Sequence, residues 1–309
     1  QLLFADYDNE TRCFKVDWPQ ASDRSAEAVL SAGLATGVRD YVAKNHFPGV
    51  LLGLSGGIDS ALTLAIAVDA LGADKVTAVM LPTRYTSDLS LREAKSQADR
   101  LGVDYHVIAI ESAFETMRES LQPLFEGRAE DVTEENMQAR IRGVLLMALS
   151  NKFGRMVLTT GNKSEMAVGY STLYGDMCGG FAPLKDVYKT MVWSLSRWRN
   201  ARDGAGKVDW VIPPVVIDRP PSAELRNDQT DQDSLPPYDV LDDILQRFIE
   251  KQQSDDEIIA AGFDEAIVRK VLRLVLVSEY KRRQSAPGPR VSSKAFGRDR
   301  RYPISSGWR

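Results

Sequence analysis

The stretch Leu51-Leu52-Gly53-Leu54-Ser55-Gly56-Gly57-Ile58-Asp59-Ser60 decides the fold of this chain. Its apolar start, residues 50–54, is typical of a buried strand, and the small residues after it allow the backbone to turn tightly. Residues 60–71 then predict a helix whose unpaired N–H groups face that turn. A strand, a small-residue turn and a helix N-terminus in this order predict a binding site for an anion such as phosphate.

The acidic residue in the turn indicates which phosphate chemistry to expect. A kinase-type loop, G-x-x-x-x-G-K-[ST], carries a lysine that reaches the outer phosphates, whereas this turn has Asp59 beside Ser60 and no lysine. We therefore expect Asp59 to meet phosphate through Mg²⁺. A turn that holds pyrophosphate as a leaving group favours attack at the α-phosphorus and transfer of AMP. The alternative is a turn that only redirects the chain. Such a turn does not require two adjacent glycines before an acid and a serine.

Length and composition are those of a globular protein. The chain has 309 residues, of which 43% are hydrophobic and 27% charged, so it can bury a sizeable core. No apolar stretch approaches the roughly 18 to 20 residues that span a bilayer, and a net charge of −4 argues against wholesale nucleic-acid binding. Two cysteines cannot build a disulfide framework and no secretory signal precedes them, so we expect a cytoplasmic protein without membrane contact.

Strands and helices alternate along the first half of the chain. Helices are expected at 26–45, 60–71, 88–101, 112–121 and 134–152, and strands at 50–54, 76–81, 105–110 and 155–160. This order predicts right-handed βαβ units, hence an α/β fold with a twisted, parallel, Rossmann-like sheet and helices on both faces. The small-residue turn then lies at the carboxyl edge of the sheet, where such folds place ligands.

The second half is less regular. Residues 170–183 are glycine-rich and predict a binding loop, and 185–199 return to a helical pattern. Residues 203–237 are rich in proline and acids with no helical period, so we expect a mobile or substrate-ordered segment. Two or three helices over 239–283 complete the domain. Residues 281–309 hold nine Lys or Arg against one Asp, which fits a solvated tail or a basic arm over a phosphate-rich ligand or a neighbouring subunit.

Two further groups of residues are expected near the turn. Thr160-Gly161-Asn162-Lys163-Ser164-Glu165 follows a strand and reaches the same sheet edge, where Glu165 can be a second carboxylate for Mg²⁺. The alternative is that Ser164 and Glu165 only cap a helix. Asn136 and Arg140 are four residues apart and share a helix face, with Arg142 roughly opposite Arg140. They flank an expected core stripe of Met137, Ile141, Val144, Leu145 and Ala148, and can contact either a ligand or solvent.

In combination these motifs resemble a known family. Ser-Gly-Gly-x-Asp-Ser at 55–60 is the signature of the ATP pyrophosphatase superfamily, whose members adenylate their substrates. The whole set closely resembles NAD synthetase, in particular the synthetase portion of the glutamine-dependent enzyme. The matching stretches lie between about residues 30 and 309, at 53–60, 134–143, 160–165, 170–176, 181–190, 221–225, 279–283 and 296–303.

The resemblance implies a substrate, nicotinic acid adenine dinucleotide (deamido-NAD), whose carboxylate is adenylated by ATP before ammonia displaces AMP to give NAD. It implies Asp59 and Lys189 as catalytic residues, and Asp59 and Glu165 as Mg²⁺ ligands. The implied ATP contacts are Gly53, Leu54, Ser55, Gly56, Gly57, Ile58, Asp59, Ser60, Thr160, Lys189 and Ser222. The implied deamido-NAD contacts are Asn136, Arg140, Glu165, Tyr170, Ser171, Thr172, Tyr280 and Lys281.

The resemblance also has departures. Short, ammonia-dependent members carry a lysine and an aspartate in the glycine-rich loop where this chain has Leu173 and Gly180, so Ser171, Thr172 and Asp176 are the candidates to replace them. Polar residues at these loop positions fit the glutamine-dependent members of the family.

The resemblance divides the chain into three parts. Residues 1–20 look like the end of a nitrilase-type amidase (glutaminase) domain and its linker, 21–285 like the synthetase domain, and 286–309 like a basic tail. Neither Cys13 nor Cys178 has a plausible base beside it, so this chain is expected to use free ammonia, with glutamine hydrolysis supplying ammonia in the full-length enzyme. Family members are dimers or larger, which implies a homo-oligomer.

Three other functions are open to a phosphate-binding turn of this kind. A tRNA-modifying adenylating enzyme would want a basic binding domain and often paired cysteines, which an acidic chain without C-x-x-C does not offer. GMP or asparagine synthesis is disfavoured because residues 160–165 and 181–190 do not look like those enzymes. A non-catalytic nucleotide-binding module is weakened by the presence of both proposed Mg²⁺ carboxylates.

Overall fold

Four parallel strands form the central sheet of the protein, in the order β5-β4-β3-β6. The computed structural model describes residues 5–16, 25–202 and 210–305. The strands are β3 (Val50–Gly53), β4 (Val76–Met80), β5 (Asp104–Val107) and β6 (Met156–Leu158). Val50 pairs with Val76 on one side and with Met156 on the other, so the carboxyl ends of β3, β4 and β6 meet at one edge. The predicted parallel α/β sheet is confirmed.

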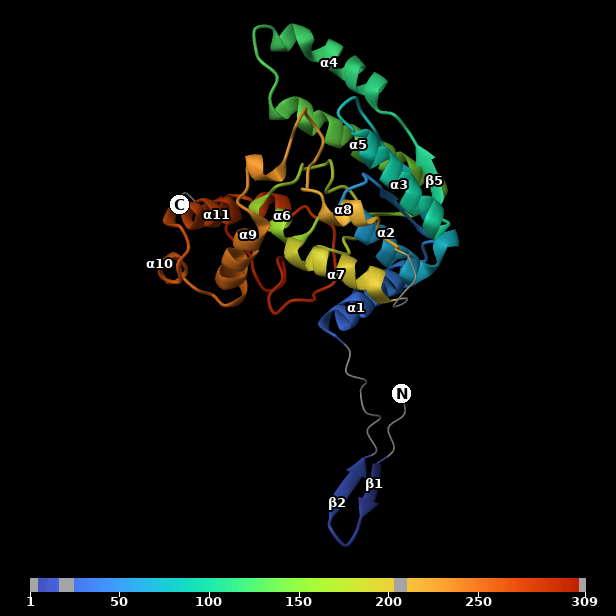
Figure 1. Cartoon of the computed structure of the whole chain (residues 1–309), viewed down its shortest axis with the longest axis vertical. Coiled ribbons are helices and arrows are strands. Elements are labelled where there is room, and N and C mark those ends of the chain that lie inside the picture. The colour runs from blue at the N-terminus through green and yellow to red at the C-terminus, as the bar shows by residue number, and fades with distance from the viewer. Residues whose placement is uncertain (1–4, 17–24, 203–209, 306–309) are drawn as a thin grey trace.

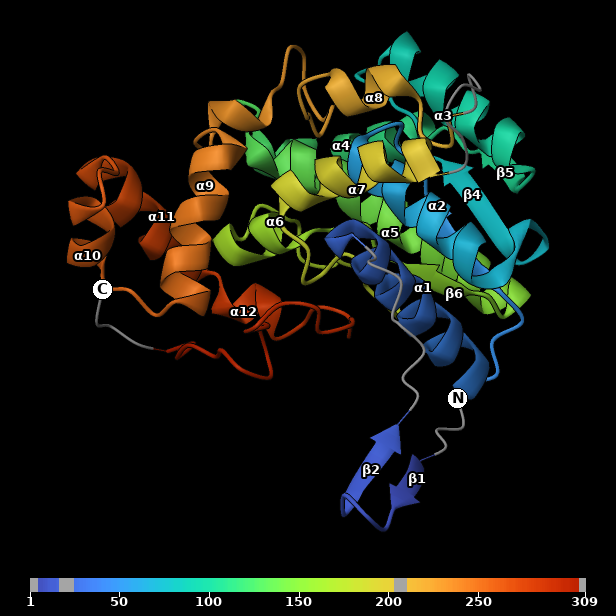
Figure 2. The same cartoon turned by 60° about the horizontal axis from the view of Figure 1, so that its bottom comes forward.

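Helices cover both faces of this sheet (Figures 1 and 2). One face carries α2 (Ile58–Leu71), α3 (Asp88–Leu101), and behind them α1 (Ala26–Lys44) and α7 (Lys189–Arg202). The other face carries α4 (Glu111–Phe125) and α5 (Val132–Phe153). Because α2 lies between the sheet and the outer helices, nearly its whole surface is buried, which explains why its sequence is apolar all round.

A second helical layer packs beside the sheet. It consists of α6 (Lys163–Val168), α9 (Tyr238–Leu245) with the π-helical turn Gln246–Glu250, α10 (Asp255–Ala260), α11 (Glu265–Val277) and α12 (Glu279–Arg282). These elements share an apolar core of their own, with Leu241, Ile244 and Val271 at its centre. The layer holds α6 at the carboxyl edge of the sheet, which matters for the site described below (Figure 2).

The N-terminal residues form a separate antiparallel hairpin of β1 (Ala5–Asp8) and β2 (Cys13–Val16). The rest of the segment 1–20, at residues 1–4 and 17–20, lies outside the described residues. Within the described ranges, every helix is too short or too polar to cross a bilayer.

Several predicted elements differ from the structure. The helix expected at 185–199 begins only at Lys189, because the Ser164 hydroxyl accepts the Lys189 N–H and fixes the helix start there. Residues 239–283 form four helices, α9 to α12, rather than two or three. In α5, Met137 and Ile141 are buried as predicted, but Val144 is 64% exposed and is not part of the core.

The proline-rich segment is more ordered than its sequence suggests. Residues 210–237 include α8 (Pro214–Asp218) and a 3₁₀ turn, Asp231–Asp233, with Val216, Ile217 and Asp231 buried. Residues 210–237 of the segment expected to be mobile or substrate-ordered thus contain packed elements, and residues 203–209 lie outside the described residues. Apolar side chains spaced along α8 bury it against α7, although the segment as a whole has no helical period.

Candidate active site

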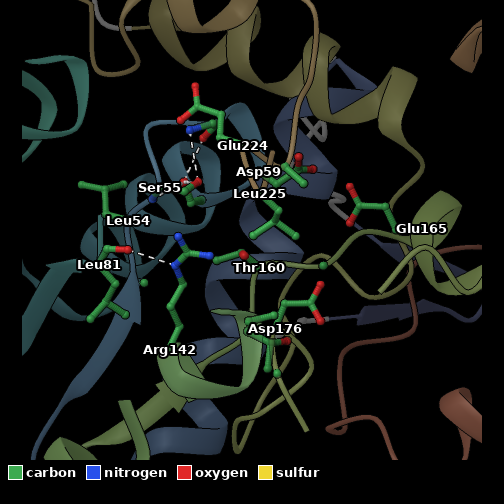
Figure 3. A pocket seen from close by; sticks show the side chains of 18 of the residues that line it. Leu54, Ser55, Asp59, Leu81, Arg142, Thr160, Glu165, Asp176, Glu224 and Leu225 are labelled. Carbon is green, nitrogen blue, oxygen red and sulfur yellow. Dashed lines mark hydrogen bonds between the residues drawn. The ribbon is translucent and has the colours of Figure 1, made fainter. Parts of the chain in front are cut away.

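A cavity of about 270 Å³ opens at the carboxyl edge of the sheet. Its wall is formed by the ends of β3, β4 and β6, the first turn of α2, the middle of α5 and the segment 216–231. Figure 3 shows side chains from these separate parts of the chain pointing into one space. This is the position that the order of strands and helices predicts for a ligand.

The small-residue turn after β3 forms one end of the cavity. The Ser60 hydroxyl donates to the Gly57 carbonyl at 2.9 Å and accepts the Ser55 N–H at 3.2 Å, which closes the turn on itself. The first N–H groups of α2 have no partner within the helix and are left for an anion. Gly56 has a φ of +77°, and a Cβ there would lie 2.5 Å from the Ser90 carbonyl oxygen, so only glycine fits.

Two carboxylates and a lysine meet beside this turn. Lys189 Nζ lies 2.5 Å from Asp59 Oδ2 and 3.5 Å from Glu165 Oε1. Asn162 Nδ2 donates to the other oxygen of Asp59 at 2.9 Å. The Lys189 side chain is 2% exposed, so its charge is removed from water and depends on the two carboxylates. The sequence placed Asp59 and Glu165 on separate loops and Lys189 in a helical stretch, and the structure brings the three together.

The surroundings shift the pKa values of these groups strongly. Burial, then the neighbouring charge of Asp59, raise the pKa of Glu165 to about 8, and Lys189 offsets only part of this effect. Burial opposes protonation of Lys189, but Asp59 and Glu165 outweigh it and hold the lysine pKa above its usual range. At neutral pH the site therefore contains a charged Lys189 and a largely protonated Glu165.

The cavity wall carries an excess of acid. Among the described residues, five carboxylates line it, namely Asp59, Glu165, Asp176, Glu224 and Asp231, against the three cations Arg142, Lys189 and Arg219. No cluster of three or more His, Cys, Asp or Glu suited to a metal occurs in the described ranges. The two carboxylates that flank Lys189 are thus the candidates for an oxygen-preferring cation, which needs only one or two of them.

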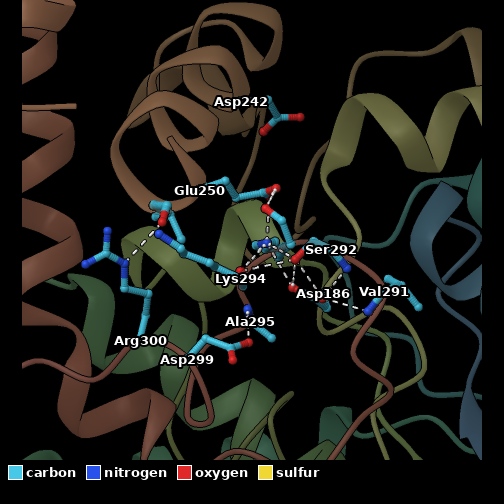
Figure 4. A network of polar contacts seen from close by, with 12 residues as sticks. Asp186, Asp242, Glu250, Val291, Ser292, Lys294, Ala295, Asp299 and Arg300 are labelled. Atoms are coloured by element: carbon cyan, nitrogen blue, oxygen red, sulfur yellow. Dashed lines mark hydrogen bonds and ion pairs between the residues drawn. The ribbon is translucent and has the colours of Figure 1, made fainter. Parts of the chain in front are cut away.

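Helix α6 is held in place by a buried ionic network (Figure 4). The Lys163 side chain is fully buried, and its ammonium group contacts Asp186 at 2.9 Å, Glu250 at 3.0 Å and the Ser292 hydroxyl at 2.6 Å. It also donates to the Lys294 carbonyl at 2.9 Å. The Asp186 carboxylate accepts the Ser292 N–H at 2.8 Å. Part of the basic C-terminal segment is therefore packed against α6.

A second network joins α6 to α7. The Ser164 hydroxyl donates to Asp242 Oδ1 at 2.5 Å and accepts the Lys189 N–H at 2.9 Å. The other oxygen of Asp242 accepts the N–H and the hydroxyl of Thr190, both at 2.8 Å. Because Glu165 follows Ser164 directly, this network sets the distance between Glu165 and Lys189. Asn162 also caps α6, with its side chain accepting the Glu165 N–H at 3.0 Å.

The glycine-rich loop forms the other end of the cavity. The Thr172 hydroxyl donates to Asn136 Oδ1 at 2.7 Å, and its N–H donates to Asp176 at 2.7 Å. Burial raises the pKa of Asp176 to about 6. Arg140 Nε donates to the Leu173 carbonyl at 3.3 Å, so the helix face carrying Asn136 and Arg140 contacts this loop.

Most of the predicted site residues line the cavity. These are Gly53, Leu54, Ser55, Gly57, Ile58, Asp59, Ser60, Thr160, Glu165, Tyr170, Thr172, Lys189 and Ser222. The others lie behind or beside the wall, namely Gly56, Asn136, Arg140, Ser171, Tyr280 and Lys281. Lys281 is tied to the glycine-rich loop through the carbonyls of Gly169 and Ser171, at 2.8 and 2.7 Å. Tyr280 is 43% exposed and does not line the cavity.

Sequence reasoning missed four charged residues of the wall. Arg219 donates to the Gly56 carbonyl at 2.8 Å, and Glu224 accepts the Ser87 and Ser90 hydroxyls, both at 2.8 Å. Together with Asp231 they lie on the segment that showed no helical period. Arg142 could have been recognised, because a residue opposite an exposed Arg140 on a helix that covers a sheet must face that sheet.

The fold and the site together define a nucleotide-binding α/β protein of the PP-loop, Rossmann-like type. Residues 30–285 match the sequence model of the NAD synthase family. The chain is 59% identical to the glutamine-dependent NAD(+) synthetase of Xanthomonas campestris pv. campestris over 309 residues, all of this chain and 55% of that protein. The chain therefore belongs to the NAD synthase family, which comprises ligases.

Solved structures agree with this assignment. A glutamine-dependent NAD+ synthetase from Acinetobacter baumannii, solved with ADP, superposes with a TM-score of 0.67 and is 52% identical, covering 99% of this chain and 54% of that chain. An NMN synthetase from Francisella tularensis superposes with a TM-score of 0.70 at 26% identity, covering 84% of this chain and 96% of that one. The chain thus spans about half the length of the curated relatives it matches.

Proposed function

We propose that this chain catalyses the ATP-dependent amidation of nicotinic acid adenine dinucleotide to NAD, with release of AMP and pyrophosphate. The observation that carries the proposal is the contact of Lys189 with both Asp59 and Glu165 beside the turn at 55–60. The similarity to glutamine-dependent NAD(+) synthetases, one of them solved with ADP, supports ATP as the nucleotide. Ammonia is the nitrogen donor for this chain.

The first step activates the carboxylate. Backbone N–H groups of residues 58–60, at the start of α2, hold the β- and γ-phosphates, with Thr160 and Ser222 contacting the rest of ATP. A nicotinate carboxylate oxygen attacks the α-phosphorus, the bond from that phosphorus to the bridging oxygen breaks, and pyrophosphate leaves with the electron pair. Lys189 donates to the oxygens on which negative charge develops. The product of this step is the dinucleotide adenylate.

The two carboxylates beside Lys189 fit a Mg²⁺ site. They are hard oxygen ligands from the first turns of two helices, α2 and α6. The excess of carboxylates in the wall leaves negative charge that a divalent cation would neutralise. Bound by Asp59 and Glu165, Mg²⁺ would act as a Lewis acid toward the phosphates. Lys189, which otherwise bridges the carboxylates, is then free to turn toward the substrate phosphates.

The second step forms the amide. Ammonia attacks the carbonyl carbon, a C–N bond forms, the C–O bond to AMP breaks, and one proton passes to solvent. The dinucleotide extends from the cavity along the glycine-rich loop, with Tyr170, Ser171, Thr172 and Glu165 nearest to the reacting end. Asn136, Arg140, Tyr280 and Lys281 lie beyond the wall and are proposed to hold its distal portion.

The complete protein is proposed to carry a glutaminase domain that supplies ammonia. The curated relatives are named glutamine-dependent, and this chain covers little more than half of their length. A homodimer or larger homo-oligomer is proposed as the functional unit. Several residues proposed to contact the dinucleotide lie outside the cavity, so part of this ligand would stay uncovered in a single subunit.

A product assay tests the proposed function. Purified protein is mixed with Mg·ATP, ammonium and either nicotinic acid adenine dinucleotide or nicotinic acid mononucleotide, and the nucleotides are resolved by chromatography. We expect NAD, AMP and pyrophosphate with the dinucleotide only. The mononucleotide is included because an NMN synthetase shares this fold. Amidation of the mononucleotide alone, or formation of ADP instead of AMP, would contradict the proposal.

A further inference from the structure

Arg142 lies in the cavity wall with most of its hydrogen-bond donors unused. Its Nε donates to the carbonyl oxygen of Leu81, at the end of β4, at 2.9 Å. In the part of the chain that the structure describes, its two terminal nitrogens have no hydrogen-bond or ion-pair partner, and Arg142 lines the cavity. Figure 3 shows the guanidinium between Leu81 and Thr160, pointing into the open space. One bond therefore orients the group, and four N–H donors remain for a ligand.

The other cations of the wall are already engaged. Lys189 lies between Asp59 and Glu165. Arg219 donates to the Gly56 carbonyl at 2.8 Å and to the Ser90 hydroxyl at 3.0 Å, which supports the turn from outside. Among the described residues, Arg142 is thus the cation of the cavity whose donors face the ligand space.

The charge of Arg142 requires an anionic partner. Burial lowers the pKa of Arg142 to about 10, with Glu224 opposing this effect, so the group is still charged at neutral pH. A half-buried cation without a bonded carboxylate is costly, and a ligand anion removes that cost. Adenine and ribose carry no charge, so the partner must be a phosphate or a carboxylate.

We propose that Arg142 is a further catalytic residue whose guanidinium contacts the α-phosphate of the nucleotide. This inference rests on the proposed function and adds a residue to it. The turn at 55–60 takes the two outer phosphates, and the residues proposed for the dinucleotide lie at the glycine-rich end of the cavity. Arg142 lies between these two ends, close to Thr160, where the phosphorus under attack must be. A planar guanidinium can bind two oxygens of that phosphoryl group and stabilise the charge that develops there.

Binding of AMP compared with adenosine tests the contact, because the two ligands differ only in the α-phosphate. Dissociation constants are measured for the wild type, Arg142→Gln and Arg142→Lys. We expect Arg142→Gln to weaken AMP binding by roughly 10- to 100-fold and to leave adenosine binding within about threefold. Arg142→Lys keeps the positive charge but lacks the planar guanidinium, so it should weaken AMP binding less. It serves as the test if Arg142→Gln does not fold.

Arg39→Gln is the matched control. Arg39 also donates from Nε to a backbone carbonyl, that of Ala70, at 3.0 Å, but it lies outside the cavity, so both affinities should stay at the wild-type values. Equal weakening of AMP and adenosine in Arg142→Gln would show a structural role and overturn the proposal, as would unchanged AMP binding. A loss seen with ADP but not with AMP would assign the contact to the β-phosphate and overturn it too. Release of AMP and pyrophosphate by the wild type tests the proposed function separately.

Discussion

Lys189 connects the two parts of the site. It reaches from the start of α7 to Asp59 on the turn after β3 and to Glu165 on α6. Its sequence neighbours give no sign of this, because a lysine on a helix is normally solvated. The ion pairs keep the site together when no nucleotide is bound, and they leave a charged amine positioned next to the place where phosphates are proposed to bind.

Replacing Asp59 tests the core of the site. Asp59→Asn removes one proposed Mg²⁺ ligand and the closer partner of Lys189, so we expect turnover to fall by about 100-fold or more. Asp69→Asn is the control, because Asp69 is also on α2 but pairs with Arg199 at 2.8 Å outside the cavity. It should retain turnover. Steady-state rates and circular dichroism of both variants make the comparison, and an undiminished rate in a folded Asp59→Asn protein would defeat the metal assignment.

The raised pKa of Glu165 predicts a pH-dependent affinity for Mg²⁺. Since burial and Asp59 raise that pKa to about 8, a proton competes with the metal below this pH. The apparent Mg²⁺ affinity should rise with pH between 6.5 and 8, by up to about tenfold per pH unit, and level off above it. Metal titrations at each pH measure this. Glu165→Gln should flatten the dependence of Mg²⁺ affinity on pH, which distinguishes titration of Glu165 from protonation of the nucleotide. Identical slopes in the two proteins would refute the assignment of Glu165 as a Mg²⁺ ligand.

Gly56 is a position where backbone geometry alone decides the residue. Its φ is +77° and a Cβ would lie 2.5 Å from the Ser90 carbonyl oxygen, so Gly56→Ala should cost about 2–4 kcal/mol of unfolding free energy. Gly102→Ala is the control, because Gly102 has a φ of +69° with no atom within 4 Å of its added Cβ. It should cost only about 1 kcal/mol. Urea unfolding measures both, and equal losses would show that the contact with Ser90 has no effect.

At the level of elements, α6 is the part of the fold that the site depends on most. It has only six residues, too few to be stable alone, and it carries Glu165. Lys163 anchors it to residues 292–294 of the C-terminal segment, and Ser164 anchors it to α9 and α7. Two adjacent buried polar residues thus do the positioning that the helix cannot do by itself.

Ser164→Ala is predicted to loosen this arrangement. It removes the hydroxyl that joins Asp242 to the Lys189 N–H, so unfolding free energy should fall by about 1–3 kcal/mol and Mg²⁺ affinity by roughly tenfold. Ser196→Ala also deletes a buried hydroxyl, one that donates to the Val192 carbonyl within α7. It should affect stability with no change in Mg²⁺ affinity. If both variants bind Mg²⁺ as the wild type does, Ser164 has only a structural role.

The elements of the nucleotide-binding half were predictable because they are apolar and regularly spaced. The expected helix 88–101 coincides with α3, and the expected strand 50–54 with β3 to within a residue. The start of α7 was not predictable, since it depends on Ser164, a residue 25 positions away. The helix of the proline-rich segment was not predicted, because short helices that pack against other elements need no amphipathic period of their own.

The location of the candidate site was predicted better than its extent. The turn at 55–60, Asp59, Glu165 and Lys189 line one cavity as expected, because adjacent parallel strands bring their following loops together. Arg142 was not identified as a site residue, although its position opposite Arg140 on α5 indicates that it faces the sheet. Glu224 was not identified because its role depends on which way its side chain faces after packing. Spacing along the chain does not contain that information for a segment without a clear period.

At the level of the whole molecule, the proposed nitrogen donor of this chain is ammonia. Cys178, a free cysteine in the described residues, lines the cavity, and burial raises the pKa of its thiol, which disfavours the reactive thiolate. We therefore predict that ammonium supports NAD formation by this chain and that glutamine does not replace it. Rates measured with each donor decide this, and comparable rates with glutamine would show that the chain hydrolyses it unaided.

The central claim is that ATP is cleaved at its α-phosphorus by the carboxylate of the dinucleotide. The most direct measurement uses dinucleotide labelled with ¹⁸O in the nicotinate carboxylate, incubated with Mg·ATP, ammonium and the protein, followed by mass spectrometry of the products. We predict one ¹⁸O atom in the phosphate of AMP for each NAD formed, and unlabelled pyrophosphate. Label in inorganic phosphate together with ADP, or AMP without label, would contradict the account.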